Sequence, residues 1–146
     1  MEKAEKLALL NTSLERAADQ LGDVTAPIMA LYYRRYPEAE AAFERLSIGD
    51  KPQLEGGMVE NTLYCAMTWL ESQAEVEIML WHTTPHHEHT LDIRLEWFTG
   101  FADALIDVIA QTIPPECRGE LAVWEEIRTG LISTMTEAAT DRRIAA

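Results

Sequence analysis

The chain has 146 residues, of which 47% are hydrophobic and 25% are charged. This balance is typical of a folded domain rather than a disordered chain, and the length predicts one domain over residues 1–146. The net charge of −13 disfavours nucleic acids and anionic membranes as partners, because both are themselves negatively charged. No stretch is apolar enough to span a bilayer and no signal-peptide pattern opens the chain, so we expect a cytoplasmic protein.

The first third of the chain has the periodicity of short helices. Apolar residues recur every three or four positions over residues 4–21, and Gly22 is expected to end that helix. Asp23 is expected to cap a second helix, which stops before Pro37. Pro37 suits the first turn of a third helix over residues 37–46.

The rest of the chain is also predicted to be helical. A loop is expected over residues 47–53, followed by a longer helix that runs to Leu70. The short apolar segment 74–81 has an ambiguous pattern, but a single strand would have no partner, so we interpret it as a helix stopped by Thr84-Pro85. A helical pattern covers residues 91–113, and a last helix starts at about residue 116. The sequence therefore predicts an all-α protein of six or seven helices.

All four histidines of the chain fall within eight residues: His82, His86, His87 and His89. Such a cluster could bind zinc, copper or nickel, since neutral imidazole suits all three, or it could be a polar turn between helices. Pro85 disfavours a continuous helix that would align His82 with His86. The chain has no hydrolase or phosphate-binding motif and no CxxCH motif for covalent haem attachment, which leaves open whether it is an enzyme.

In chain order, these features resemble the globin family over roughly residues 5–138. Tyr36-Pro37-Glu38 and Phe43 resemble the globin junction between the second and third helices, where an aromatic ring wedges against the haem. The run Met58–Leu70 stands where globins place the distal helix. His87 follows Leu70 by seventeen residues, and Ile93 and Trp97 follow His87 by six and ten. Trp124, early in the last helix, also resembles many bacterial globins.

The resemblance implies a three-over-three helical sandwich that lacks the small fourth helix of longer globins. It also implies a non-covalently bound haem b, with His87 as the proximal iron ligand through Nε2 and Thr83 or Thr84 as hydrogen-bond partner of its other ring nitrogen. A shift of the loop could give the proximal role to His86, His89 or His82 instead. The residues expected to line the haem pocket are Met29, Tyr33, Phe43, Met58, Thr62, Leu63, Ile93, Trp97 and Phe101.

Two positions depart from the familiar globin pattern. Met58 stands where many globins have a distal histidine, and Met29 stands where some bacterial globins have a distal tyrosine. Neither donates a strong hydrogen bond to a bound gas, although Thr62 offers a hydroxyl, and either methionine could bind iron through sulfur. The expected function is therefore binding or sensing of O₂, NO or CO, or haem redox chemistry. The alternative is a haem-free globin-like interaction or sensor module, with a homodimer formed through the last two long helices.

Overall fold

The computed structural model describes residues 1–86 and 93–140, and within them the chain forms seven α-helices and no strand. The all-α prediction is thus confirmed for the described part of the chain. None of the helices in that part combines the length and the apolar composition that a bilayer crossing requires. The helices are α1 (Lys3–Leu21), α2 (Thr25–Arg35), α3 (Pro37–Leu46), α4 (Lys51–Trp69), α5 (Gln73–Pro85), α6 (Leu95–Ala110) and α7 (Arg118–Thr140).

Local signals set the ends of the first three helices. Gly22 ends α1 with a positive φ of 67°, and its backbone N–H donates to the Ala18 carbonyl at 2.9 Å. The Asp23 carboxylate accepts the Thr25 backbone N–H at 2.9 Å just before α2, but the N-cap position predicted for Asp23 is occupied by Val24. Pro37 occupies the first turn of α3, whose bounds match the predicted range.

Two predicted boundaries were wrong. The loop predicted over residues 47–53 is shorter, because α4 already begins at Lys51. Asp50 caps this helix by accepting the Gln53 backbone N–H at 3.2 Å, and a proline is tolerated in the first turn. The helical pattern over residues 91–113 also overestimates α6, since Ile93 and Arg94 precede that helix and residues 111–113 form a turn after it.

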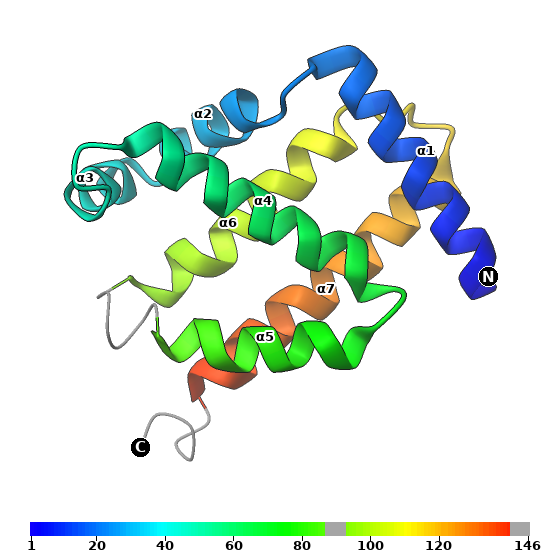
Figure 1. Cartoon of the computed structure of the whole chain (residues 1–146). Helices are drawn as coiled ribbons and strands as arrows, with labels where there is room; N and C mark the ends of the chain where they lie inside the picture. Colours follow the sequence, from blue (N-terminus) through cyan, green and yellow to red (C-terminus); the bar gives the residue numbers. More distant parts are fainter. Residues whose placement is uncertain (87–92, 141–146) are drawn as a thin grey trace.

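The helices are arranged with α4 and α5 over α6 and α7 (Figure 1). Helix α7 packs against α1, α4, α5 and α6, while α6 also packs against α1, α2 and α4. The centre of the core is formed by fully buried side chains of α6 and α7, among them Leu105, Ile106, Trp124, Ile127 and Leu131. Helices α6 and α7 thus hold α1, α2, α4 and α5 in place, while α3 packs against α2 and α4.

A close approach between α4 and α7 depends on a missing side chain. Trp69, at the end of α4, is buried with its indole directly over Gly130 of α7. A Cβ atom at position 130 would overlap that ring. Gly130 therefore lets the two helices come closer than any larger residue would allow.

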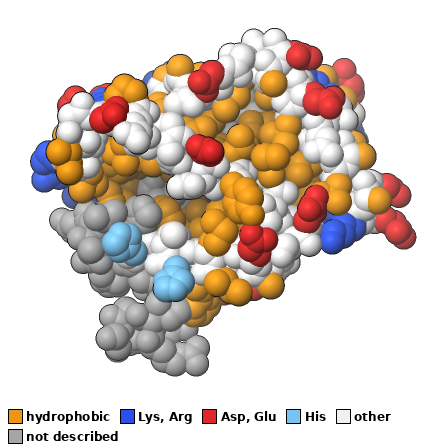
Figure 2. Space-filling view, in the orientation of Figure 1, with side chains coloured by type: hydrophobic (Ala, Val, Ile, Leu, Met, Phe, Trp, Pro, Cys, Tyr) orange, Lys and Arg blue, Asp and Glu red, His pale blue; other side chains and the backbone are white. Residues whose placement is uncertain are grey.

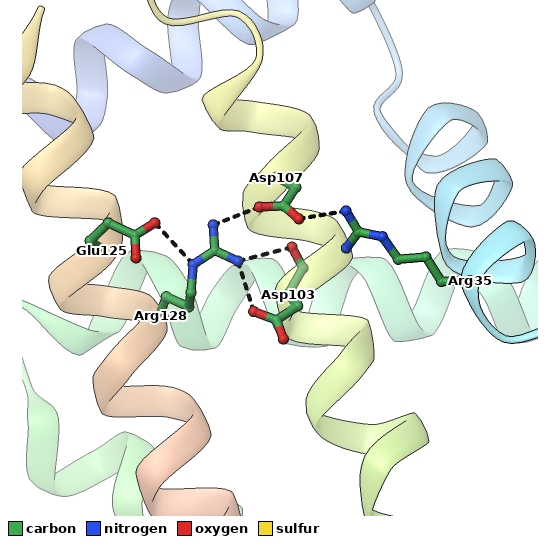
Figure 3. Close-up of polar contacts among 5 residues, drawn as sticks. All are labelled: Arg35, Asp103, Asp107, Glu125 and Arg128. Carbon is green, nitrogen blue, oxygen red and sulfur yellow. Dashed lines mark hydrogen bonds and ion pairs between the residues drawn. The ribbon is translucent and has the colours of Figure 1, made fainter.

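An ion-pair network joins α2, α6 and α7 at the surface (Figure 3). The Arg128 guanidinium of α7 donates to Asp103 Oδ1 at 2.7 Å, to Asp107 Oδ1 at 2.6 Å and to Glu125 Oε1 at 3.0 Å. Asp107 also accepts from Arg35 of α2 at 2.7 Å. Asp107 is thus bonded to two arginines from two different helices, which fixes both helices against α6.

Candidate functional site

A largely apolar cavity of about 350 Å³ lies among α3, α4, α5, α6 and α7. Its volume falls within the range of small-molecule and cofactor sites, roughly 300–1,000 Å³. Figure 2 shows hydrophobic side chains spread over the face that α4 and α5 present, with only scattered acidic groups among them. The cavity is lined by Phe43, Leu46, Leu54, Met58, Asn61, Thr62, Cys65, Met79, Leu80, Thr83, Ile93, Phe98, Phe101 and Met135.

Aromatic packing holds one wall of the cavity. Tyr32 stacks on Phe43 with ring centroids 5.9 Å apart and meets Phe101 edge-on at 5.1 Å. The Tyr32 hydroxyl donates to the backbone carbonyl of Trp97 at 2.8 Å, so α2 is bonded to the first turns of α6. Burial raises the pKa of Tyr32 and keeps its hydroxyl protonated as that donor. The rings of Phe43 and Phe101 are therefore fixed before any ligand is bound.

The helix α4 contributes a continuous stripe to the opposite wall. Leu54, Met58, Thr62 and Cys65 follow one another at intervals of three or four residues, so they share one face of the helix. Asn61, next to this stripe, is exposed and lies at the edge of the cavity. The α4 wall is therefore apolar, apart from one hydroxyl and an amide near the opening.

Helix α5 faces the cavity through Met79, Leu80 and Thr83. His82 and His86, by contrast, are exposed, and the two histidines coloured in Figure 2 lie at the molecular surface. The Thr84 hydroxyl is buried and has no hydrogen-bond partner among the described residues. An unpartnered buried hydroxyl is uncommon, and here it stands three residues before His87.

Five of the nine predicted pocket residues line this cavity: Phe43, Met58, Thr62, Ile93 and Phe101. The other four, Met29, Tyr33, Leu63 and Trp97, are not among the lining residues. His87 and His89 lie outside the described residues, so their predicted roles stay predictions. The structure therefore describes the α5 residues that come before the predicted proximal ligand in the chain, but not that ligand itself.

Two of those four residues are engaged elsewhere. The Tyr33 hydroxyl donates to Glu55 Oε2 at 2.6 Å, and burial together with this bond raises the pKa of Tyr33. Trp97 is buried beneath the Arg94 guanidinium, which lies 5.0 Å from its ring centroid. Both side chains stabilise the surroundings of the cavity rather than its surface.

Sequence reasoning missed nine lining residues. Leu54, Cys65, Met79 and Leu80 continue helical stripes that are visible in the sequence, so the period of each helix could have found them. Met135 lies on the last helix, and no pattern in the sequence places it near α4 and α5. The others are Leu46, Asn61, Phe98 and Thr83, the last of which had been expected only as a partner of the histidine.

A second hollow of about 420 Å³ lies between the end of α1, α2 and the end of α6. Its lining is about equally polar and apolar and includes Gln20, Arg34, Gln111 and Thr112. Arg34 is exposed, and none of the predicted site residues borders this hollow. We therefore take the apolar cavity under α4 and α5 as the candidate site.

A multi-histidine metal centre receives no support from the described part of the chain. Within residues 1–86 and 93–140, no three His, Cys, Asp or Glu side chains are grouped so that they could hold a metal ion. Only His82 and His86 of the four histidines belong to that part.

No protein-family model, curated protein or solved structure matches this chain.

Proposed function

We propose that this chain is a globin-like protein that binds haem b non-covalently in the apolar cavity, with His87 as the proximal iron ligand. In this proposal it binds or senses O₂, NO or CO, or it performs haem redox chemistry. The observation that carries the proposal is the meeting of Phe43, Met58, Thr62, Ile93 and Phe101 on one cavity. The resemblance to globins implies these residues as haem neighbours, and they come from three helices and the segment before α6.

The chemistry of the cavity walls fits a haem. A porphyrin needs a crevice of apolar and aromatic side chains, with few polar groups and one strong axial ligand. Two buried phenylalanine rings, aliphatic side chains and methionines supply the apolar walls. The helix order also agrees with a globin that lacks the small fourth helix, because only the turn over residues 47–50 joins α3 to α4.

The face of α5 that borders the cavity favours His87 over His82 and His86. Met79 and Thr83 line the cavity four residues apart, and position 87 continues that interval in the sequence. His82 and His86 are exposed instead. Thr83 or the unpartnered hydroxyl of Thr84 would then accept a hydrogen bond from the ring of His87 and fix its tautomer.

A bound haem would supply an iron centre for diatomic ligands or for electron transfer. The residues of this chain would determine which of the two prevails. Phe43 and Phe101 would exclude water from one side of the cavity. Thr62 and Asn61 are the hydrogen-bond donors that α4 contributes to the cavity lining. A hydroxyl and an exposed amide are weak donors to a bound gas, so we do not expect tight O₂ storage.

The alternative is a haem-free globin-like module that acts through protein contacts. Large apolar side chains on α4 and α5 favour it, since Tyr64, Met67 and Ile78 are exposed by 47%, 42% and 67%. A homodimer through α6 and α7 is less favoured, because much of the surface of both helices already packs against other helices. Any interaction surface would then lie on α4 and α5.

Titration of the full chain with hemin tests the proposal. We expect a Soret band that saturates at one haem per chain, and we expect His87→Ala to lose or strongly shift it. His82→Ala and His86→Ala are matched controls from the same segment, and neither should change the band. Added imidazole should restore the His87→Ala spectrum, which a merely misfolded variant would not allow. Wild-type protein that fails to bind hemin would contradict the proposal and favour the haem-free alternative.

A further inference from the structure

Helices α4 and α5 carry three large apolar side chains on their exposed surface: Tyr64, Met67 and Ile78. Tyr64 and Met67 lie three residues apart and therefore share one face of α4. The Tyr64 hydroxyl donates to Glu75 Oε1 of α5 at 2.6 Å, and Ile78 follows Glu75 by three residues. This bond joins the exposed faces of the two helices. We call Tyr64, Met67 and Ile78 the α4–α5 patch.

The charged groups around the α4–α5 patch are almost all acidic. Residues 52–93 contain no lysine or arginine, although the whole chain has twelve. Glu60, Glu71 and Glu75 are exposed, and all three belong to α4, α5 or the turn between them. Of the nearby cations, Lys51 at the start of α4 is paired with Glu40 at 3.1 Å. Lys3 of α1 donates to the Glu71 carbonyl at 3.1 Å, at the turn between the two helices.

We propose that the α4–α5 patch is a docking surface for a basic amphipathic segment of another protein. Such a segment places apolar side chains on the patch and lysines or arginines beside the surrounding glutamates. An amphipathic helix is the form that fits a surface built by two neighbouring helices. None of the three patch residues lines the cavity, so this inference goes beyond the proposed haem function and holds with or without haem.

The three side chains of the patch are suited to a contact with another protein. Tyr64 offers an aromatic ring whose hydroxyl is already held by Glu75, so little conformational freedom is lost when a partner covers it. Met67 is flexible and can adapt its shape to the partner. Ile78 is 67% exposed, so it gains the most from burial in a complex.

The charge of the chain separates this partner from other occupants of the patch. A second copy would bring its own glutamates and a net charge of −13 against the same surface, which electrostatic repulsion opposes. Helices that lie on membranes are typically rich in lysine and arginine on their polar face, and residues 52–93 have neither. A basic segment instead supplies the charge that the patch lacks.

The experiment measures how the full chain binds a synthetic amphipathic peptide of about 18 residues, roughly five turns of helix. Leucines occupy one face of the peptide, and lysine or glutamine occupies the other positions. Fluorescence anisotropy should show saturable binding of one labelled peptide per chain. Met67→Ser/Ile78→Ser should weaken it roughly tenfold or more, because apolar anchors dominate such contacts. Ile48→Ser is the matched control, since Ile48 is 92% exposed but lies on the turn before α4.

A second set of variants tests the role of charge. Glu60→Gln/Glu71→Gln should weaken binding and make it less sensitive to salt, because two of the facing charges are removed. Glu15→Gln/Asp19→Asn is the matched control, since it removes two exposed negative charges from α1 instead. It should leave the affinity close to that of wild type. All these substitutions change exposed residues, so the variants are expected to fold, as circular dichroism would verify.

A peptide with serine in place of every leucine should bind much more weakly. The inference is overturned if the leucine peptide does not bind, if the serine peptide binds equally well, or if the control variants lose as much affinity as the patch variants. Analytical ultracentrifugation and sedimentation with zwitterionic vesicles test the other occupants. Self-association or vesicle binding that Met67→Ser/Ile78→Ser abolishes would also overturn the inference, because a second copy or a membrane would then occupy the patch.

The test is independent of the proposed haem function when each titration is run on both the hemin-free and the hemin-loaded chain. The patch variants should keep the Soret band of wild type, because the substituted side chains lie outside the cavity lining. Loss of peptide binding would therefore leave the haem proposal standing. A chain that fails to bind hemin should still bind the leucine peptide.

Discussion

Individual residues decide how closely the helices of this protein approach each other. Gly130 has no side chain where the Trp69 indole crosses α7, and the ring occupies the space that a Cβ atom would need. Glycine weakens a helix through its conformational freedom, so its use within α7 has a local cost. The tight contact between α4 and α7 offsets that cost.

We expect Gly130→Ala to destabilise the protein by roughly 1–3 kcal/mol, because the buried indole cannot move away without disturbing its neighbours. Gly57→Ala is the matched control, since Gly57 also lies within a helix but a Cβ there would meet nothing within 4 Å. That change should stabilise the protein by about 0.5–1 kcal/mol through better helix propensity. Urea denaturation of both variants measures the difference, and equal effects would contradict the packing role of Gly130.

At the level of secondary-structure elements, the contact of α6 with α2 and α7 depends on the charged side chains around Arg128. Burial alone would raise the pKa of Asp107, but its bonds to Arg128 and Arg35 outweigh burial and hold that pKa below the ordinary 3.8. The carboxylate form is therefore favoured in the folded state. A depressed folded pKa adds stability above the unfolded pKa, and this stability is lost as the pH falls through the folded pKa.

We expect Asp107→Asn to reduce the unfolding free energy at pH 7 by roughly 1–3 kcal/mol, as is typical of hydrogen bonds to charged groups. The difference from wild type should shrink as the pH falls below about 4, where the wild-type carboxylate also becomes protonated. Urea denaturation across this pH range provides the measurement. Glu125→Gln serves as a control, because Glu125 is 62% exposed and its pair with Arg128 should contribute at most about 1 kcal/mol. A gap between Asp107→Asn and wild type that persists at low pH would refute the electrostatic explanation.

At the scale of the whole molecule, the cavity couples ligand binding to stability. It lies among five helices, so a molecule that fills it contacts much of the core at once. A ligand that binds only the folded state stabilises it by about 2.7 kcal/mol at a hundredfold excess over Kd. For a domain of this size, such a gain corresponds to a rise of roughly 5–10 °C in Tm.

We therefore expect hemin to raise the Tm of wild type by roughly that amount in differential scanning calorimetry. His87→Ala should show a clearly smaller shift, because the iron–histidine bond is lost while the apolar contacts remain. His82→Ala should behave as wild type, since His82 is exposed. Equal shifts in His87→Ala and wild type would mean that hemin binds without the proposed proximal ligand.

The sequence by itself determined most of the helices and part of the site. Pro37 and Gly22 act through neighbouring backbone atoms, so local pattern was enough to place the ends of α1 and the start of α3. The start of α4 was misjudged because residues 51–53 look like a loop until the Asp50 cap is known. The resemblance to globins implied Phe43, Met58, Thr62, Ile93 and Phe101 as pocket residues, and all five line the cavity.

Only the tertiary structure decided which helix faces enclose the cavity. Met29 and Leu63 are apolar residues on suitable helices, yet neither lines the cavity, because the rotation of a helix about its axis depends on its partners. Met135 is distant in sequence from α4 and α5, and the packing of α7 against both of them brings it there. Local hydrogen bonds and periodicity specify the helices, whereas contacts between distant segments select the side chains that meet.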